Sequence, residues 1–265
     1  MTPETSPWRG GSFGSHDCVL APNANPMTLD GTNTWILRSG ERSVVVDPGP
    51  LDDGHLSAVG EAAGDVAVVL LTHHHLDHSE GAKAFAERVG CGVRALDPEY
   101  RLGSEGLGHG DVVTVGDLEV HVVGTPGHSS DSLSFWLPET SAVLTGDTVL
   151  GRGTTVVAHP DGQLGAYLDS LDRLRALADE RDLAWIWPGH GPAISDALAT
   201  LDYYIGHRRD RLEQVRTALA LVGDDVLPDD VPRAVVEIVY ADVDPVLWGA
   251  AELSVRAQLA YLRRL

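Results

Sequence analysis

Short apolar runs and amphipathic stretches alternate along most of the chain. Val66–Leu71 is apolar without interruption and has the length of a strand, which predicts a strand covered on both faces. Between Leu164 and Leu177 the apolar residues recur at steps of three and four, which predicts an amphipathic helix. Because strands and helices alternate without an internal repeat, we expect a layered α/β architecture.

The other elements of this α/β region follow from the same two periodicities. Two further helices are predicted, at Gly54–Ala63 and Gly81–Val89. The other predicted strands, each ending near Gly, Pro or Asp, are Thr34–Arg38, Ser43–Val46, Leu118–Val123, Ser132–Leu137, Ala142–Leu144 and Ala184–Trp187.

Both ends of the chain depart from this alternation. Residues 1–30 are rich in Gly, Pro and Ser, so we expect a mobile or loosely packed N-terminal arm there. Beyond Asp196 almost the whole chain has helical periodicity. We therefore divide the chain into the arm at 1–30, a domain at 31–206 and a C-terminal helical segment at 207–265.

Three helices are predicted towards the C-terminus, at Leu198–Val222, Val231–Val239 and Val246–Leu262. In the last of them, Leu247 and Leu259 belong to a row of apolar residues near one helical face. A face this apolar must be covered. We therefore expect the segment to pack against the rest of the chain or at a homodimer interface, and to help wall a substrate cleft.

Composition narrows the class of protein. The chain is 43% hydrophobic and 22% charged, as in ordinary soluble globular proteins. No window approaches the roughly 20 apolar residues of a membrane span, and the first residues lack the basic and apolar regions of a secretory signal. Cys18 and Cys91 are far apart in the sequence, which excludes a disulfide framework and a cysteine-rich zinc finger. We expect a cytoplasmic protein without a membrane partner.

The net charge argues against one class of ligand, and the distribution of the histidines indicates a candidate site. The formal net charge of −20 disfavours general binding to the phosphate backbone of nucleic acids. Four of the twelve histidines fall within six residues. They lie directly after the predicted strand Val66–Leu71, in the sequence Thr72-His73-His74-His75-Leu76-Asp77-His78.

This histidine-rich loop has the composition and spacing of a metal site. Imidazole and carboxylate are the ligands that zinc prefers when thiolates are absent. On extended backbone His73 and His75 point the same way and His74 points away, so one metal ion can bind the first two. Asp77 and His78 follow one turn later, where they are placed to bind a second ion.

Three further fragments each place one His or Asp just past a predicted strand, with a glycine beside it. They are Thr125-Pro126-Gly127-His128, Thr145-Gly146-Asp147 and Pro188-Gly189-His190-Gly191. Because ligands at the strand ends of one sheet edge can share a site, these fragments make a solvated histidine loop an unsatisfactory explanation.

These residues resemble the metallo-β-lactamase superfamily over roughly Gly31–Arg211. The resemblance implies an αββα sandwich of two mixed sheets with helices outside, and a dinuclear zinc hydrolase, with manganese or iron as alternative metals. It also implies a metal-bridging hydroxide, which attacks a carbonyl or phosphoryl centre and which Asp77 orients. The implied ligands are His73, His75 and His128 for the first ion, Asp77, His78 and His190 for the second, and Asp147 between them.

Three longer strings resemble the lactamase-β-like-2 group, whose mitochondrial members are endoribonucleases directed at single-stranded RNA. The strings are Gly31-Thr32-Asn33-Thr34, Gly146-Asp147-Thr148-Val149-Leu150-Gly151-Arg152-Gly153-Thr154-Thr155 and Pro188-Gly189-His190-Gly191-Pro192. The group has a winged-helix-like C-terminal segment, which Asp230–Leu265 resembles. The sequence ends about where the wing hairpin would begin, so we expect no wing and no reading of nucleic-acid sequence by this segment.

Five residues outside the ligand set are further candidates. Asp47, at the end of Ser43–Val46, is either a hydrogen-bond partner of a ligand or part of an ordinary turn. Arg152, Thr154 and Thr155 are candidates to bind a phosphate or carboxylate of the substrate, against the alternative of loop packing. His159 is a candidate proton donor to a leaving group, against the alternative of an exposed loop histidine.

Two substrate classes remain open. Cleavage of RNA phosphodiester bonds is the leading hypothesis, because the subgroup strings favour it. Hydrolysis of a small thioester, ester or lactone, as in glyoxalase II-like enzymes, is favoured by the acidic composition. A binding module with a vestigial metal site is a third reading, which is disfavoured because all seven ligand positions are filled.

Overall fold

Two β-sheets form the body of the molecule. The structure, a computed structural model, describes residues 7–222 and 227–264. The first sheet has the strand order β1-β2-β3-β4-β5-β6 and the second the order β11-β10-β9-β8-β7. The strands of the first sheet are Gly11–Phe13, His16–Leu20, Asn33–Ser39, Arg42–Val46, Asp65–Leu70 and Gly92–Arg94. Those of the second, from β7 to β11, are Val112–Val115, Leu118–Gly124, Leu133–Leu137, Ala142–Gly146 and Trp185–Pro188.

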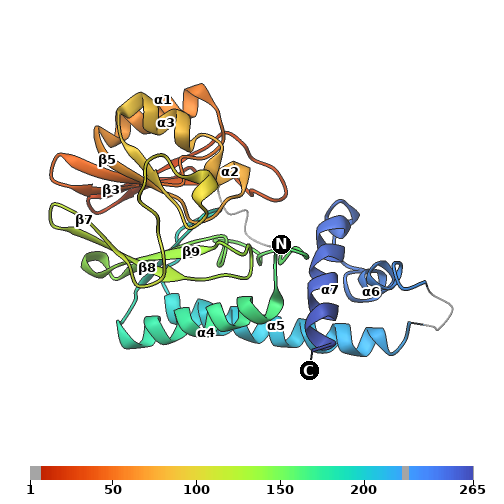
Figure 1. Cartoon of the computed structure of the whole chain (residues 1–265). Helices are drawn as coiled ribbons and strands as arrows, with labels where there is room; N and C mark the ends of the chain where they lie inside the picture. Colours follow the sequence, from red (N-terminus) through yellow and green to blue (C-terminus); the bar gives the residue numbers. More distant parts are fainter. Residues whose placement is uncertain (1–6, 223–226, 265) are drawn as a thin grey trace.

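Helices cover both outer faces of this sandwich (Figure 1). On the first sheet lie α1 (Asp53–Ala63) and α3 (Ala82–Val89), and on the second lie α4 (Leu164–Glu180) and the first part of α5 (Ala197–Leu219). Short α2 (Leu76–Ser79) follows β5 at one edge. The four layers are the αββα arrangement expected from the sequence.

The inner faces of the two sheets enclose the largest apolar core. Strand β5 shows how its sequence serves two layers at once: Leu70 belongs to the core between the sheets, and Val69 to the core beneath α1 and α3. The prediction of a strand covered on both faces is therefore confirmed. The spacing in α4 is also confirmed, because Tyr167, Leu171 and Leu174 are all buried against the second sheet.

The N-terminal residues belong to the sandwich rather than to an arm. Strands β1 and β2 extend the first sheet beyond β3 by antiparallel pairing. The ring centre of Phe13 lies 5.2 Å from that of Trp35 and 5.6 Å from that of Trp187. The indoles of Trp35 and Trp187 stack with their ring centres 4.8 Å apart. The predicted loose arm over residues 1–30 is therefore wrong where the chain is described. Residues 1–6 lie outside the described residues.

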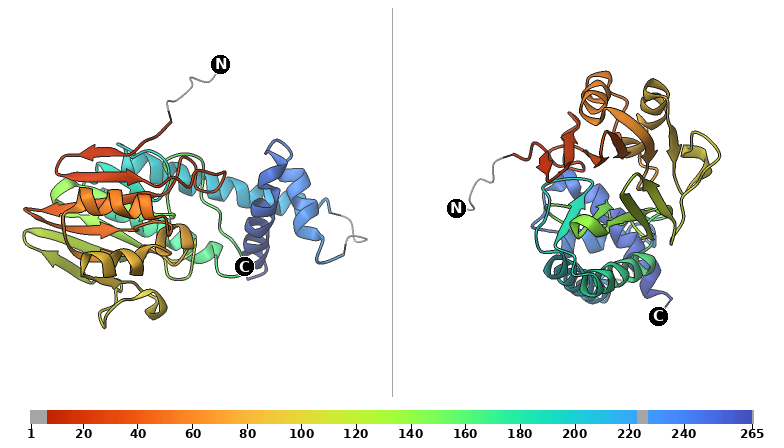
Figure 2. Two further views of the ribbon diagram at one scale, coloured as in Figure 1. Left: turned by 90° about the horizontal axis from the view of Figure 1, so that it is seen from above. Right: turned by 90° about the vertical axis from the view of Figure 1, so that its left-hand side faces the viewer.

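The C-terminal helices α6 (Val231–Val239) and α7 (Trp248–Leu262) pack on the far half of α5. Figure 2 shows α5 projecting past the sandwich, with α6 and α7 gathered at that end. Val215, Val235 and Val255 meet in one apolar cluster, so the segment packs within the chain. The domain boundary predicted between residues 206 and 207 falls inside α5, so one continuous helix serves both units.

The helices of the described residues include none that is both long enough and apolar enough to cross a membrane. Residues 227–264 form helices and turns.

We predict that Phe13→Ala destabilises the protein by about 2 kcal/mol, because it empties a half-buried site among Trp8, Trp35 and Trp187. Urea unfolding measures the change. Leu51→Ala is the control, since Leu51 is 57% exposed and its truncation should cost less than about 0.5 kcal/mol. Equal stabilities of the two variants would show that β1 adds nothing to the core.

Candidate metal centre

The seven predicted ligands come together at one edge of the sandwich. His73 and His75 follow β5, and α2 then presents Asp77 and His78. His128 lies beyond the end of β8, Asp147 directly after β10, and His190 after β11. Because β8, β10 and β11 run in the same direction, their carboxyl ends meet at the same edge of the second sheet.

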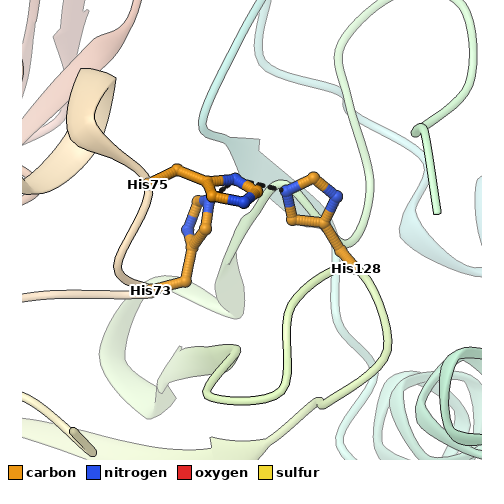
Figure 3. Close-up of side chains that lie close together, drawn as sticks. All are labelled: His73, His75 and His128. Carbon is orange, nitrogen blue, oxygen red and sulfur yellow. Dashed lines mark hydrogen bonds between the residues drawn. The ribbon is translucent and has the colours of Figure 1, made fainter. Parts of the chain in front are cut away.

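Three imidazoles form the first ligand group (Figure 3). His75 Nδ1 lies 3.1 Å from His73 Nε2 and 3.0 Å from His128 Nε2. The rings come from two loops, one after β5 and one after β8, and point toward one another. Around a tetrahedral zinc ion, neighbouring nitrogens are about 3.4 Å apart, so this spacing is within a few tenths of an ångström of that geometry.

Asp77, His78 and His190 form the second group. His190 Nε2 lies 3.3 Å from His78 Nε2 and 3.1 Å from Asp77 Oδ2. Asp147 lies between the two groups, with Oδ2 3.7 Å from His128 Nε2 and 3.3 Å from His190 Nε2. One carboxylate is therefore in reach of both groups.

The second ring nitrogen of most ligands is held by an oxygen. His128 Nδ1 donates to the carbonyl of Val156 at 2.8 Å, and His190 Nδ1 to the carbonyl of Gly31 at 3.2 Å. His73 Nδ1 donates to the hydroxyl of Thr72 at 2.9 Å. These bonds leave the lone pair of Nε2 directed at the centre, as is usual for metal-binding histidines.

Asp47 orients a ligand from behind. Its carboxylate accepts hydrogen bonds from Thr72 N at 2.8 Å, from Thr72 Oγ1 at 2.6 Å and from His78 Nδ1 at 2.9 Å. Its φ of 51° is left-handed, which is costly for a residue with a side chain. The structure thus favours the partner role of Asp47 over the ordinary turn.

Burial and charge set the protonation of the cluster. Burial and the neighbouring His128 lower the pKa of His75 to about 4, and burial with His78 lowers that of His73. Burial alone would lower the pKa of His190, but Asp147 and Asp77 outweigh it and raise that pKa to about 9. The first group is therefore neutral at pH 7, while His190 in the second is protonated when no cation replaces the proton.

The donor set fits a pair of divalent cations. Asp147 Oδ1 is buried and has no hydrogen-bond partner among the described residues, as expected of an oxygen that serves a cation. All seven donors are nitrogen or oxygen, which suits zinc, manganese or iron. Gly189 permits the close approach, because a Cβ there would lie 2.5 Å from Asp147 Oδ1 and 2.7 Å from His78 Cε1.

Residues near the ligands have other contacts. His74 points away from the centre as predicted, and its Nδ1 lies 2.7 Å from Asp131 Oδ1. Arg152 pairs with Asp30 at 3.0 Å, and Thr155 Oγ1 donates to the carbonyl of Asp147 at 2.6 Å. Two candidates for substrate binding are thus already engaged within the chain. Thr154, the third, is partly buried.

A cavity of about 410 Å³ opens beside the centre. His128 and Asp147 lie in its wall, together with Arg152, Thr154 and Thr155. His159 is exposed and does not line it. The opposite wall comes from α5, α7 and the segment between α6 and α7, so the C-terminal segment walls the cleft as predicted.

Sequence reasoning did not assign Arg208 and Arg211 of α5 to the site, although both line this cavity. Their only signal in the sequence is the spacing of three residues, which places them on one helix face. Which face of α5 is directed toward the metal centre depends on how this helix packs, and local sequence does not determine that.

Comparisons with known proteins concern the domain that carries these residues and the C-terminal segment. A model of the metallo-beta-lactamase superfamily matches residues 27–190, and a model of the beta-lactamase associated winged helix domain matches residues 232–264. The beta-lactamase-like protein 2 homolog of Drosophila melanogaster is 30% identical, over 93% of this chain and 87% of that protein.

Two further relatives bear on activity and on fold. An atrochrysone carboxyl ACP thioesterase of Aspergillus fumigatus is 34% identical, over 76% of this chain and 64% of that protein. The crystal structure of a beta-lactamase domain protein from Burkholderia ambifaria has a TM-score of 0.79 at 22% identity, covering 99% of this chain and 90% of that one. This last likeness concerns the fold alone.

We predict that Gly189→Ala lowers metal content while the fold is retained, because the added methyl group collides with Asp147 and His78. Metal analysis and circular dichroism measure the two quantities. Gly206→Ala is the matched control: a Cβ there meets nothing within 4 Å, and alanine favours the helix by about 0.5–1 kcal/mol. Wild-type metal affinity in Gly189→Ala would contradict the placement of the centre.

The two ligand groups should respond differently to pH. A cation that binds the second group must displace the proton of His190, whose pKa is about 9, and that of His78, whose pKa Asp147 and Asp77 raise against the effect of burial. Affinity there should therefore rise by at least about tenfold per pH unit up to pH 9. The first group carries lowered pKa values and should bind equally well from pH 7 to 9. Chelator competition across this range measures both affinities. If both metal equivalents bound with the same pH dependence of affinity, the assignment of different protonation states to the two ligand groups would be wrong.

Proposed function

Since the chain belongs to the metallo-β-lactamase superfamily, whose members are hydrolases, we propose that it hydrolyses a small acyl thioester or ester at a dinuclear metal centre. The centre is formed by His73, His75 and His128, by Asp77, His78 and His190, and by Asp147 between them. The observation that carries the proposal is the cavity of about 410 Å³ beside these ligands.

The size and lining of this cavity favour a small molecule. Its volume lies within the range of about 300–1,000 Å³ that is usual for ligand sites. Leu150 and Val156 line it beside the centre, and Leu247 and Ala251 line it from the C-terminal segment. These side chains would pack against an acyl chain and exclude water from it. The thioesterase relative from Aspergillus fumigatus supports the same bond type.

Each residue of the centre has a defined task in this proposal. A pair of divalent cations, zinc or alternatively manganese or iron, would supply a water-derived nucleophile at neutral pH and polarise the carbonyl of the substrate. Asp77, whose side chain is 30% exposed, would orient the attacking water. Asp47, Thr72 and Gly31 keep the histidines in position through the hydrogen bonds described above.

Cleavage of single-stranded RNA is the second candidate. The match of residues 232–264 to a winged helix domain favours it. The net charge of −20 opposes it, because so acidic a surface repels phosphate backbones at long range. Thioester or ester substrates and single-stranded RNA should therefore be compared in the same experiment.

We predict that the metal-loaded protein hydrolyses acyl thioesters of N-acetylcysteamine faster than it cleaves single-stranded RNA. Asp77→Asn should lower kcat by roughly 10²–10⁴-fold, because an amide cannot accept the proton of the attacking water. Thiol release and metal content are measured together, so that loss of chemistry is separated from loss of metal.

Glu80→Gln is the matched control, since this exposed carboxylate lies three residues further along the chain. Its activity should equal that of the wild type. Cleavage of RNA without hydrolysis of any thioester or ester would replace the proposal by its second candidate. Full activity of Asp77→Asn would place the reaction elsewhere.

A further inference from the structure

Two arginines of α5 face the cavity beside the metal centre without a partner of opposite charge. Arg208 and Arg211 both line this cavity. Within the described residues neither guanidinium forms an ion pair with an Asp or Glu, although the chain has 39 acidic residues. Two unpaired arginines at one cavity therefore need an explanation.

Neutral groups fix the orientation of both guanidinium groups. Arg208 is only 7% exposed; it donates to the carbonyl of Thr155 and lies 4.8 Å from the ring centre of Tyr167. Arg211 donates to the carbonyl of Val239 at 2.9 Å and lies 4.5 Å from the ring centre of Tyr240. Carbonyls and aromatic faces orient a guanidinium, but they leave its net charge in place.

The same region contains buried polar atoms without a hydrogen-bond partner. Arg208 Nε and His207 Nδ1 are buried and have no partner among the described residues. The guanidinium groups of Arg208 and Arg211 make this part of the cavity wall electropositive, and burial followed by their charges lowers the pKa of His207 in the same wall. A buried unpaired cation is costly unless an anion occupies the site for part of the working cycle.

Arg152 shows how an arginine of this cavity can be neutralised within the chain. It lines the same cavity, yet its guanidinium pairs with Asp30 at 3.0 Å. The chain thus neutralises one arginine of this cavity internally and leaves two of them unneutralised. The unneutralised pair lies on a helix, where backbone hydrogen bonds hold their spacing constant.

We propose that Arg208 and Arg211 bind an anionic group, a carboxylate or a phosphate, carried by the substrate of the metal centre. The inference rests on the proposed function and narrows its substrate class to an acyl thioester or ester with a negative charge some distance from the bond that is broken. The apolar wall of Leu247 and Ala251 covers the uncharged part of such a molecule. Guanidinium groups suit both anions, because their donors match two oxygens at once.

A binding experiment tests the arginines without requiring turnover. The metal-depleted full-length chain is titrated with succinate and with inorganic phosphate in a calorimeter, so that the anion cannot bind a metal ion instead. We expect the wild type to bind at least one of them, and Arg211→Gln to weaken that binding by at least about tenfold. Arg209→Gln, which removes the same charge from an exposed position of α5, should leave it unchanged.

A kinetic experiment with the metal-loaded protein identifies which anion is used. One pair of substrates compares a succinyl with a levulinoyl thioester, and a second compares phosphopantetheine with pantetheine as the thiol of the same thioester. The wild type should prefer the anionic member of one pair by at least about tenfold in kcat/KM. Arg211→Gln should lose that preference and Arg209→Gln should keep it. The pair that shows the preference identifies a carboxylate or a phosphate.

The outcomes separate this inference from the proposed function. Anion binding that depends on Arg211 supports the inference even if no thioester is hydrolysed, in which case only the proposed function fails. Absence of binding of either anion to the wild type overturns it. If Arg211→Gln and Arg209→Gln weaken anion binding equally, the inference is also overturned, because the loss would then be a general effect of net charge. Arg208→Lys, which keeps a donor for Thr155, should lose the preference as well, and thermal unfolding verifies that each variant is folded.

Discussion

The carboxylate of Asp47 connects the first sheet to the metal centre. It follows β4, accepts two hydrogen bonds from Thr72 after β5, and holds His78 of α2 through Nδ1. The left-handed backbone of Asp47 is tolerated because these bonds, all buried, outweigh its cost. The two sheets can contribute ligands to one point only if each strand end is held in this way.

The second sheet is tied to the same point by Asn33. Its amide donates to the carbonyls of Pro188 at 3.0 Å and Gly191 at 2.8 Å, which bracket His190. The backbone N–H of Asn33 donates to the carbonyl of Gly189. A residue at the start of β3 in the first sheet therefore sets the position of a ligand that follows β11 in the second. The sandwich thereby holds ligands from both sheets at one point.

Electrostatics divide the cavity into two parts. At the centre, Asp77 and Asp147 raise the pKa of His190 and favour a cation. Across the cavity, the charges of Arg208 and Arg211 favour an anion and add to the effect of burial in lowering the pKa of His207. The C-terminal helices hold this second part in place, since α7 packs beside α5 and closes the apolar wall. The helix that leaves the sandwich thereby joins a general hydrolytic centre to a surface that selects substrates.

Local sequence patterns determined most elements and all seven candidate ligands. The spacing of apolar residues and the positions of glycines can be recognised within a few residues of sequence. His73, His128, Asp147 and His190 each follow a strand that such a local pattern predicts. The Gly-rich strands β1 and β2 escaped prediction, because their stability comes from Phe13 packing on Trp35 and Trp187, far along the chain.

Tertiary structure alone decided which charged residues are available to a ligand. Arg152 and Arg208 look alike in the sequence, but only the fold brings Asp30 to the first and leaves the second without a carboxylate among residues 7–222 and 227–264. Charge pairing depends on distances between segments that local periodicity does not encode. The sequence therefore determined the chemistry of the centre, while the fold decided what surrounds it.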